Sequence, residues 1–156
     1  KFNNIWHHGD YAEMKNSGGF IIYGRSDTTL NPGGVRLGTS EIYSEVEKFK
    51  EIKESIVIGQ SWENDIRIIL FVIMNKNYKL NNKLIKRIKI QIRTNASPRH
   101  VPNKILNVND IPRTKNGKIV ELAVKNIIEG NKIKNKEALI NPEILNDFKN
   151  IKELQY

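Results

Sequence analysis

The chain has 156 residues, enough for one hydrophobic core and a small appendage but not for two full domains. It has no cysteine, which excludes disulfides and cysteine-ligated metal sites and gives no reason to expect an oxidising compartment. No apolar run approaches the roughly 18–20 residues of a membrane span, so we expect a cytoplasmic protein without one. The net charge of +9 favours an anionic partner or reflects a general bias toward Lys, Asn and Ile.

Turn residues organise the first predicted elements. Phe20–Tyr23 lies between two glycine-containing stretches, which is typical of a strand after a turn. Thr28–Asn31 and Val35–Leu37 flank Pro32-Gly33-Gly34, a pattern that predicts a short hairpin-like turn. The sequence begins without methionine and runs directly into structured-looking residues, so we expect a missing N-terminal region.

Caps, turns and hydrophobic spacing predict the remaining elements. Thr39 is expected to be the N-cap of the first helix, and Asn81 or Asn82 the cap of the second. Asn64-Asp65 suits a turn between strands. The predicted elements are a helix with Ile42, Val46 and Phe49 on one face, strands Ser55–Gln60 and Ile66–Met74, and a helix with Leu84, Ile88 and Ile92 on one face. They continue with a strand Lys104–Asn109, a helix carrying Ile119, Leu122, Ala123 and Ile127 and stopped by Gly130, and a short helix Glu143–Phe148.

This order of elements predicts an α+β fold, in which helices cover a small three-stranded sheet and a short β segment precedes it. The sequence shows no internal repeat and no low-complexity block.

Two arginines lie beside glycines near the N-terminus. Arg25 follows Gly24, and Arg36 follows Gly33-Gly34-Val35. Glycine lets the backbone approach a ligand closely, and guanidinium groups suit phosphate or carboxylate. A surface turn with solvated arginines explains the same pattern.

A lysine follows a glycine in the stretch Pro112–Ile119. Lys118 lies on a constrained loop that precedes a predicted helix, so it can be directed at an anionic group. The stretch lacks the spacing and the Lys-Ser/Thr ending of a P-loop. A solvated loop lysine is the alternative.

These stretches, taken in order, resemble the adenylate-forming superfamily of acyl-CoA synthetases, luciferases and peptide-synthetase adenylation domains. The family signature runs Gly-Asp, Gly-Arg-x-Asp, Gly-x-Arg and Pro-(Arg/Lys)-Thr-x-x-Gly-Lys. Its counterparts here are Gly9-Asp10, Gly24–Asp27, Gly34–Arg36 and Pro112–Lys118. Within the superfamily, residues 29–43, 95–102 and 117–126 are similar to the acetoacetyl-CoA synthetase family, whereas acetyl-CoA synthetases usually have Ser-Gly-His-Arg at positions 33–36.

The resemblance implies a nucleotide site and a catalytic lysine. Asp10 matches the aspartate that accepts hydrogen bonds from the ATP ribose, and Arg25 and Arg36 match arginines that contact the nucleotide. Lys118 matches the lysine that bridges the acyl carboxylate and the ATP α-phosphate. Asp27 matches a hinge about which the C-terminal domain rotates.

The resemblance also implies a CoA site and a domain organisation. Gly34, with Gly33 beside it, matches the glycine next to the CoA pantetheine, and Arg93 a CoA-phosphate ligand. Residues 1–27 are then the end of a large N-terminal domain and a hinge. Residues 28–130 are a mobile C-terminal domain, and residues 131–156 are a C-terminal extension.

The implied activity is ATP-dependent ligation of acetoacetate to CoA, with Mg²⁺ held chiefly by the nucleotide phosphates and no protein metal site. The missing N-terminal domain is an expected partner, and without it we expect the chain to be inactive. Another short or medium chain acid is an alternative substrate. A basic module that binds nucleic acid through residues 83–93 is a further alternative, but aromatic residues are not interleaved there, so no nucleic-acid partner is expected.

The histidines and tryptophans are the remaining candidates for ligand-binding residues. The adjacent His7 and His8 do not predict a metal site, because no carboxylate cluster completes one. His100 is an alternative contact for a CoA phosphate. Trp6 and Trp62 are interpreted as packing residues rather than as surfaces for stacking bases.

Overall fold

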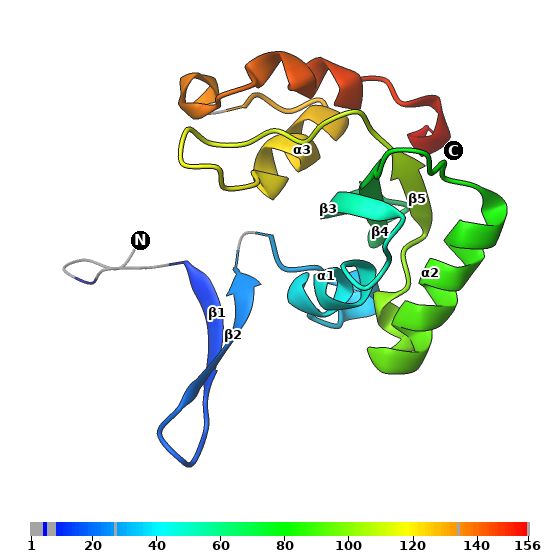
Figure 1. Ribbon diagram of the computed structural model, residues 1–156. Coiled ribbons are helices and arrows are strands. Elements are labelled where there is room, and N and C mark those ends of the chain that lie inside the picture. The colour runs from blue at the N-terminus through cyan, green and yellow to red at the C-terminus, as the bar shows by residue number, and fades with distance from the viewer. Residues whose placement is uncertain (1–4, 6–8, 27, 134, 156) are drawn as a thin grey trace.

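The computed structural model describes residues 5, 9–26, 28–133 and 135–155. A three-stranded sheet lies at the centre, helices cover both its faces, and a two-stranded hairpin projects away from it (Figure 1). The hairpin consists of β1 (Asp10–Met14) and β2 (Phe20–Arg25). The sheet contains β3 (Ile52–Trp62), β4 (Asp65–Met74) and β5 (Lys104–Asn107), and the α-helices are α1 (Ser40–Val46), α2 (Asn82–Asn95) and α3 (Glu121–Ile128). The predicted α+β fold is confirmed.

The sheet has the strand order β3-β4-β5, with β3 and β4 antiparallel and β5 parallel to β4. The turn between β3 and β4 contains Glu63 and Asn64, both with positive φ, as a two-residue hairpin turn requires. The predicted turn at Asn64-Asp65 was wrong by one residue. Asp65 is the first residue of β4 and pairs with Trp62.

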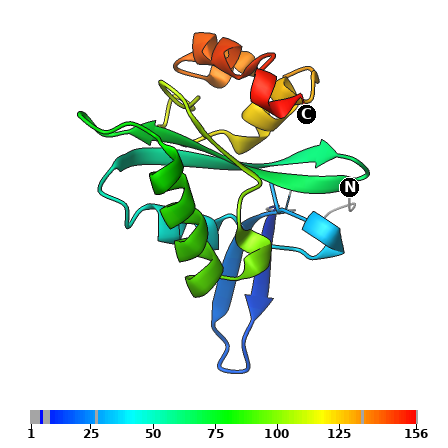
Figure 2. The same cartoon turned by 90° about the vertical axis from the view of Figure 1, so that its right-hand side faces the viewer.

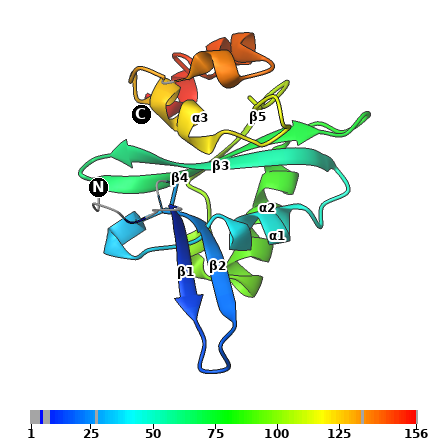
Figure 3. The same cartoon turned by 90° about the vertical axis from the view of Figure 1, so that its left-hand side faces the viewer.

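Alternate residues of β4 contribute to two separate cores. Those on one face pack with α1 and α2, and those on the other pack with α3 and the C-terminal segment (residues 131–156). Side chains alternate between the faces of a strand, so a continuous apolar run serves both cores. Figures 2 and 3 show the two layers on opposite sides of the sheet. The two sets are Ile68, Leu70 and Val72 in the first core, and Ile69, Phe71 and Ile73 in the second.

Helix starts were predicted with mixed success. The Asn81 side chain accepts a hydrogen bond from the Leu84 amide at 2.9 Å, which confirms it as the cap of α2. Thr39 occupies the cap position of α1, as predicted, but makes no side-chain cap bond. Its backbone is already helical (φ −76°, ψ −22°), whereas capping side chains act from extended backbone. Ile119 pairs with Arg113 in a β-bridge instead of starting the last helix.

The C-terminal segment packs on the same sheet face as α3, beside that helix. Its described residues contain three 3₁₀ helices, of which Pro142–Phe148 corresponds to the predicted short helix Glu143–Phe148. Phe148 is fully buried, with its ring edge-on to Phe71 at a centroid distance of 5.0 Å. Near its end, the Leu154 carbonyl accepts a hydrogen bond from the Arg67 guanidinium at 2.5 Å. The segment is therefore attached to the sheet by both apolar and polar contacts.

Trp62 packs face-on against the Arg67 guanidinium, whose central carbon lies 3.6 Å from the ring centroid. This confirms its interpretation as a packing residue. Trp6, His7, His8 and Asp27 lie outside the described residues.

Candidate active site

Three predicted nucleotide ligands surround the base of the β1–β2 hairpin. Asp10 and Arg25 lie directly opposite each other in the register of the two strands. The exposed Arg36 places its guanidinium 5.9 Å from the ring centroid of Tyr11, the next residue in β1. A carboxylate and a guanidinium thus lie on neighbouring strands, and a second guanidinium approaches the next residue of β1; groups of both kinds suit an anionic ligand with hydroxyl groups.

The glycine turn (residues 31–38) lies beside the β3–β4 turn. Leu30 and Leu37 close it by reciprocal backbone hydrogen bonds of 3.1 and 2.8 Å. The Gly33 amide donates to both carboxylate oxygens of Asp65, at 2.8 and 3.1 Å. Hydrogen bonds from the Gly33 and Ile66 amides lower the pKa of Asp65.

The surface of the glycine turn is open. Gly33 and Gly34 have φ of +57° and +77°, and a Cβ added to either would meet no atom within 4 Å. A depression of about 620 Å³ lies beside it, lined by Asn31, Gly34 and residues of the β3–β4 turn. An extended ligand can therefore pass directly over the backbone at Gly34.

The lysine loop (residues 112–119) forms a tight hairpin. The Thr114 amide donates to the Lys118 carbonyl at 2.8 Å, and the Lys118 amide donates to the Thr114 hydroxyl at 3.1 Å. Within the described residues, the Lys118 side chain is exposed and forms no hydrogen bond or ion pair. The loop thus fixes the lysine backbone and leaves its ammonium group available to a ligand.

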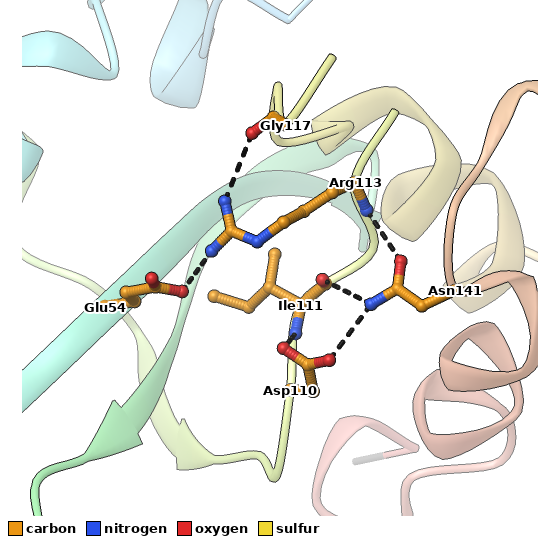
Figure 4. A network of polar contacts seen from close by, with 6 residues as sticks. All are labelled: Glu54, Asp110, Ile111, Arg113, Gly117 and Asn141. Carbon is orange, nitrogen blue, oxygen red and sulfur yellow. Dashed lines mark hydrogen bonds and ion pairs between the residues drawn. The ribbon is translucent and has the colours of Figure 1, made fainter. Parts of the chain in front are cut away.

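Arg113 attaches the lysine loop to the sheet. Its guanidinium forms an ion pair with Glu54 on β3 and donates to the Gly117 carbonyl at 3.3 Å (Figure 4). This contact was not predicted from the sequence. Arg113 belongs to the quoted motif, but nothing local to it identifies Glu54 as its partner.

Tyr43 connects α1 with the start of α3. Its hydroxyl donates to Glu121, the first residue of α3, at 2.5 Å and accepts from the Val57 amide at 3.0 Å. Burial raises the pKa of Tyr43, and the neighbouring Glu121 carboxylate raises it further. A cavity of about 320 Å³ lies between α1, β3 and the lysine loop, lined in part by Tyr43, Glu54 and Arg113.

The lysine loop and the glycine turn lie at opposite ends of the β3–β4 pair. The first contacts Glu54, near the start of β3, and the second contacts Asp65, just beyond its end. Eight residues of extended strand separate Glu54 from Trp62, which corresponds to roughly 25 Å. The two loops are therefore attached at points of β3 that lie roughly 25 Å apart, which favours their acting on a bound substrate in different orientations of the chain.

The remaining predicted contacts lie elsewhere. Arg93 is exposed in the last turn of α2, on the face of the sheet opposite α3. His100 is buried, with its Nδ1 2.8 Å from the Ser97 hydroxyl oxygen, and burial lowers its pKa. It therefore packs inside the protein in this structure and is not a surface ligand for phosphate.

Within the described residues, no group of three or more His, Cys, Asp or Glu side chains is placed to hold a metal ion. In the same part of the chain, no helix combines the length and apolar character needed to cross a membrane.

Known proteins match this chain in sequence and in fold. Residues 41–118 match the family "AMP-binding enzyme C-terminal domain". The chain is 56% identical to the acetoacetyl-coenzyme A synthetase of Rhizobium meliloti and 47% identical to that of Gallus gallus; 99% of this chain is covered each time, but only 24% of the relative. A solved acetoacetyl-CoA synthetase from Streptomyces lividans has a TM-score of 0.85 and 36% identity, covering 97% of this chain and 23% of that one.

The chain therefore spans about a quarter of the length of the relatives it matches. The family model matches half of the chain, up to Lys118. The chain therefore belongs to the AMP-binding enzyme C-terminal domain family.

Proposed function

We propose that this chain is the C-terminal part of an AMP-forming ligase that joins acetoacetate to CoA. In the first half-reaction, the acetoacetate carboxylate attacks the α-phosphorus of ATP and displaces pyrophosphate. In the second, the CoA thiolate attacks the acyl carbonyl and displaces AMP. The relatives' names support this substrate, and their greater length supports a separate N-terminal domain that binds acetoacetate and most of the nucleotide.

The observation that carries the proposal is the separation of the lysine loop and the glycine turn along β3. Two half-reactions with different nucleophiles need different groups beside the same acyl carbonyl. Rotation of this domain, with Asp27 as the hinge, would present Lys118 during adenylation and Gly34 during thioester formation.

Each predicted site residue would then have its own role in adenylation. The Lys118 ammonium would stabilise the charge that develops as pyrophosphate leaves. Asp10 would accept hydrogen bonds from the ribose, while Arg25 and Arg36 would contact the nucleotide. When bound with ATP, Mg²⁺ would neutralise phosphate charge and be held mainly by phosphate oxygens.

CoA would use the other end of the domain. Its pantetheine would pass over Gly33 and Gly34, and Arg93 would bind a CoA phosphate. Because ATP and CoA are the substrates, we propose that the protein acts in the cytoplasm.

Residues 1–27 are best explained as part of the N-terminal domain. The β1–β2 hairpin exposes a cluster of large apolar side chains, including Met14, Phe20 and Ile22. Such a cluster is expected to be covered by another part of the protein. Residues 28–130 would then be the mobile domain, followed by the C-terminal segment.

The test uses the full-length protein and the substitution Lys118→Ala. Acetoacetate-dependent pyrophosphate release should fall by about 100-fold or more, as when a major electrostatic contact is removed. CoA thioester formation from supplied acetoacetyl-adenylate should persist. Lys115→Ala, which removes another exposed lysine of the same loop, is the control and should retain both half-reactions. Equal loss of both half-reactions in Lys118→Ala would contradict the assigned role.

Two further measurements address the alternatives. Comparing acetoacetate with acetate, propionate and butyrate on the full-length protein distinguishes a different acyl-CoA synthetase. The isolated chain should release no pyrophosphate with acetoacetate and ATP, and substantial release would overturn the need for the N-terminal domain.

A further inference from the structure

We propose that Asn141 is a positioning residue for Lys118, through which the C-terminal segment holds the lysine loop in the geometry for adenylation. This inference rests on the proposed function of Lys118. Asn141 lies outside the residues that match the family model, which end at 118. It therefore adds a component of the site from a different part of the chain.

The lysine loop needs an external attachment. Its internal hydrogen bonds join Thr114 to Gly117 and Lys118 and fix its shape. They do not fix its direction, because residues 115–119 are all exposed. The direction in which Lys118 points is set by the two chain ends at the base of the loop.

Asn141 holds the base of the lysine loop through its carboxamide, which forms hydrogen bonds with Asp110, Ile111 and Arg113 where the chain enters the loop (Figure 4). Its Oδ1 accepts a hydrogen bond from the Arg113 amide at 3.0 Å. Its Nδ2 donates to the Asp110 carboxylate at 3.0 Å and to the Ile111 carbonyl at 3.1 Å. A single half-buried side chain thus satisfies donors and acceptors on three residues, 110, 111 and 113, immediately before the loop turns.

The backbone around Asn141 continues this attachment. The Ile140 amide donates to the Arg113 carbonyl at 2.9 Å, and the Lys115 amide donates to the Ala138 carbonyl at 3.1 Å. Thr114 and Leu139 form a β-bridge. One side of the lysine loop therefore pairs with residues 138–141 much as it would pair with a neighbouring strand.

The C-terminal segment can act as a support because it is itself attached to the sheet. Leu145 and Phe148 follow Asn141 within two turns and are 1% and 0% exposed. On its other side, the loop is attached to β3 by Arg113 and Glu54. Asn141 completes a two-sided attachment in which the guanidinium and the amide of Arg113 are held by different elements.

The experiment compares Asn141→Ala with Asn146→Ala in the full-length protein. Asn146 is an exposed asparagine of the same segment, and among the described residues its side chain hydrogen-bonds only with the exposed Lys149. In Asn141→Ala, adenylation should fall about 10- to 100-fold, mainly in kcat, because small misplacements of a catalytic group have effects of this size. Thioester formation from supplied acetoacetyl-adenylate should change less than about two-fold, because the glycine turn lies at the far end of β3.

A loss confined to adenylation supports positioning, whereas an equal loss of both half-reactions would show that Asn141 serves stability alone. Unchanged adenylation would also overturn the proposal. Amide hydrogen exchange supplies a readout independent of activity: residues 111–119 should exchange faster in Asn141→Ala than in Asn146→Ala, while residues 30–37 should not. Should Asn141→Ala fail to fold, Asn141→Ser provides a second variant, because its hydroxyl keeps one donor and acceptor and adds no charge beside the Asp110 carboxylate.

The outcome for Lys118→Ala separates this proposal from the proposed function. If that variant retains adenylation, the role of Lys118 fails whatever Asn141 does. If it loses adenylation and Asn141→Ala does not, only the positioning role fails.

Discussion

The lysine loop and the glycine turn are held in different ways. The lysine loop is attached on two sides, by Glu54 through Arg113 and by residues 138–141. The glycine turn is closed by the β-bridge between Leu30 and Leu37, whose side chains are buried in the first core, and its Gly33 amide is held by the Asp65 carboxylate. The two loops therefore differ in which parts of the surrounding protein fix them.

The difference matches what each loop would have to do. A lysine that stabilises developing charge has to be held close to one geometry, since its contribution depends on preorganisation. A glycine surface over which a flexible ligand passes needs only to remain open. Breaking attachments at one loop should consequently affect one half-reaction and spare the other.

The largest effect is expected for Phe148→Ala. It removes a fully buried ring that packs on Phe71, so the free energy of unfolding of the chain should fall by about 3–5 kcal/mol in urea denaturation. Exchange should rise more at the amides of the lysine loop than at Leu30 and Leu37. Ile140→Ala, at an exposed position, is the control and should change stability by less than about 0.5 kcal/mol. Equal rises in exchange at both loops would contradict separate attachment.

A smaller effect is expected for Gly34→Ala. The added Cβ meets no atom, so the cost comes from the positive φ alone and should be about 1–2 kcal/mol in urea denaturation. In the full-length protein, thioester formation should decline while adenylation is retained. Gly19→Ala is the matched control, because its Cβ meets only Ser17 Oγ, at 3.8 Å, and its backbone needs no positive φ. Loss of adenylation in Gly34→Ala would contradict the proposal that the glycine turn serves thioester formation and the lysine loop serves adenylation.

Thr114→Val should have a more local effect. It keeps the shape of the side chain and removes the acceptor of the Lys118 amide, a loss of about 1 kcal/mol. Adenylation by the full-length protein should fall by less than in Asn141→Ala, because the base of the loop stays attached. A larger fall than in Asn141→Ala would show that the internal bonds of the loop matter more than its support.

The smallest effect is expected on the stability of the glycine turn when Asp65 is protonated at low pH. Amide hydrogen bonds hold its pKa below the ordinary value of about 4, so the unfolded chain binds the proton first as pH falls. The stabilisation of the glycine turn is therefore complete above about pH 4 and is lost as pH falls through the lowered pKa. By NMR, the Gly33 amide shift should titrate in this acidic range. Asp65→Asn should abolish that titration, and a Gly33 amide that still titrates in it would point to another group.

Sequence reasoning succeeded where one strong local signal decided the structure. The apolar run Ile66–Met74 predicted β4 to within one residue, because it is buried on both faces. The spacing of Leu84, Ile88 and Ile92 predicted the buried face of α2. β3 is longer than the predicted Ser55–Gln60, since its ends are set by pairing with β4 and not by their own composition.

The candidate site was predictable only as a set of motifs. The motifs identified Lys118 and Gly34 but not their places at opposite ends of β3, which follow from tertiary contacts. Ile119 has the right spacing for a helix, yet pairing with Arg113 overrides that preference. Asn141 was missed because its partners precede it by about 30 residues. Its sequence neighbourhood, Asn141-Pro142, indicates only a turn.

The attachment of the lysine loop to residues 138–141 has a consequence for the order of synthesis. Those residues, and the buried Phe148 that fixes them to the sheet, leave the ribosome after Lys118. The first core can form while they are still inside the exit tunnel, because it contains no residue beyond Ile105 among its buried members. A nascent chain would therefore complete its glycine turn first and its lysine loop last.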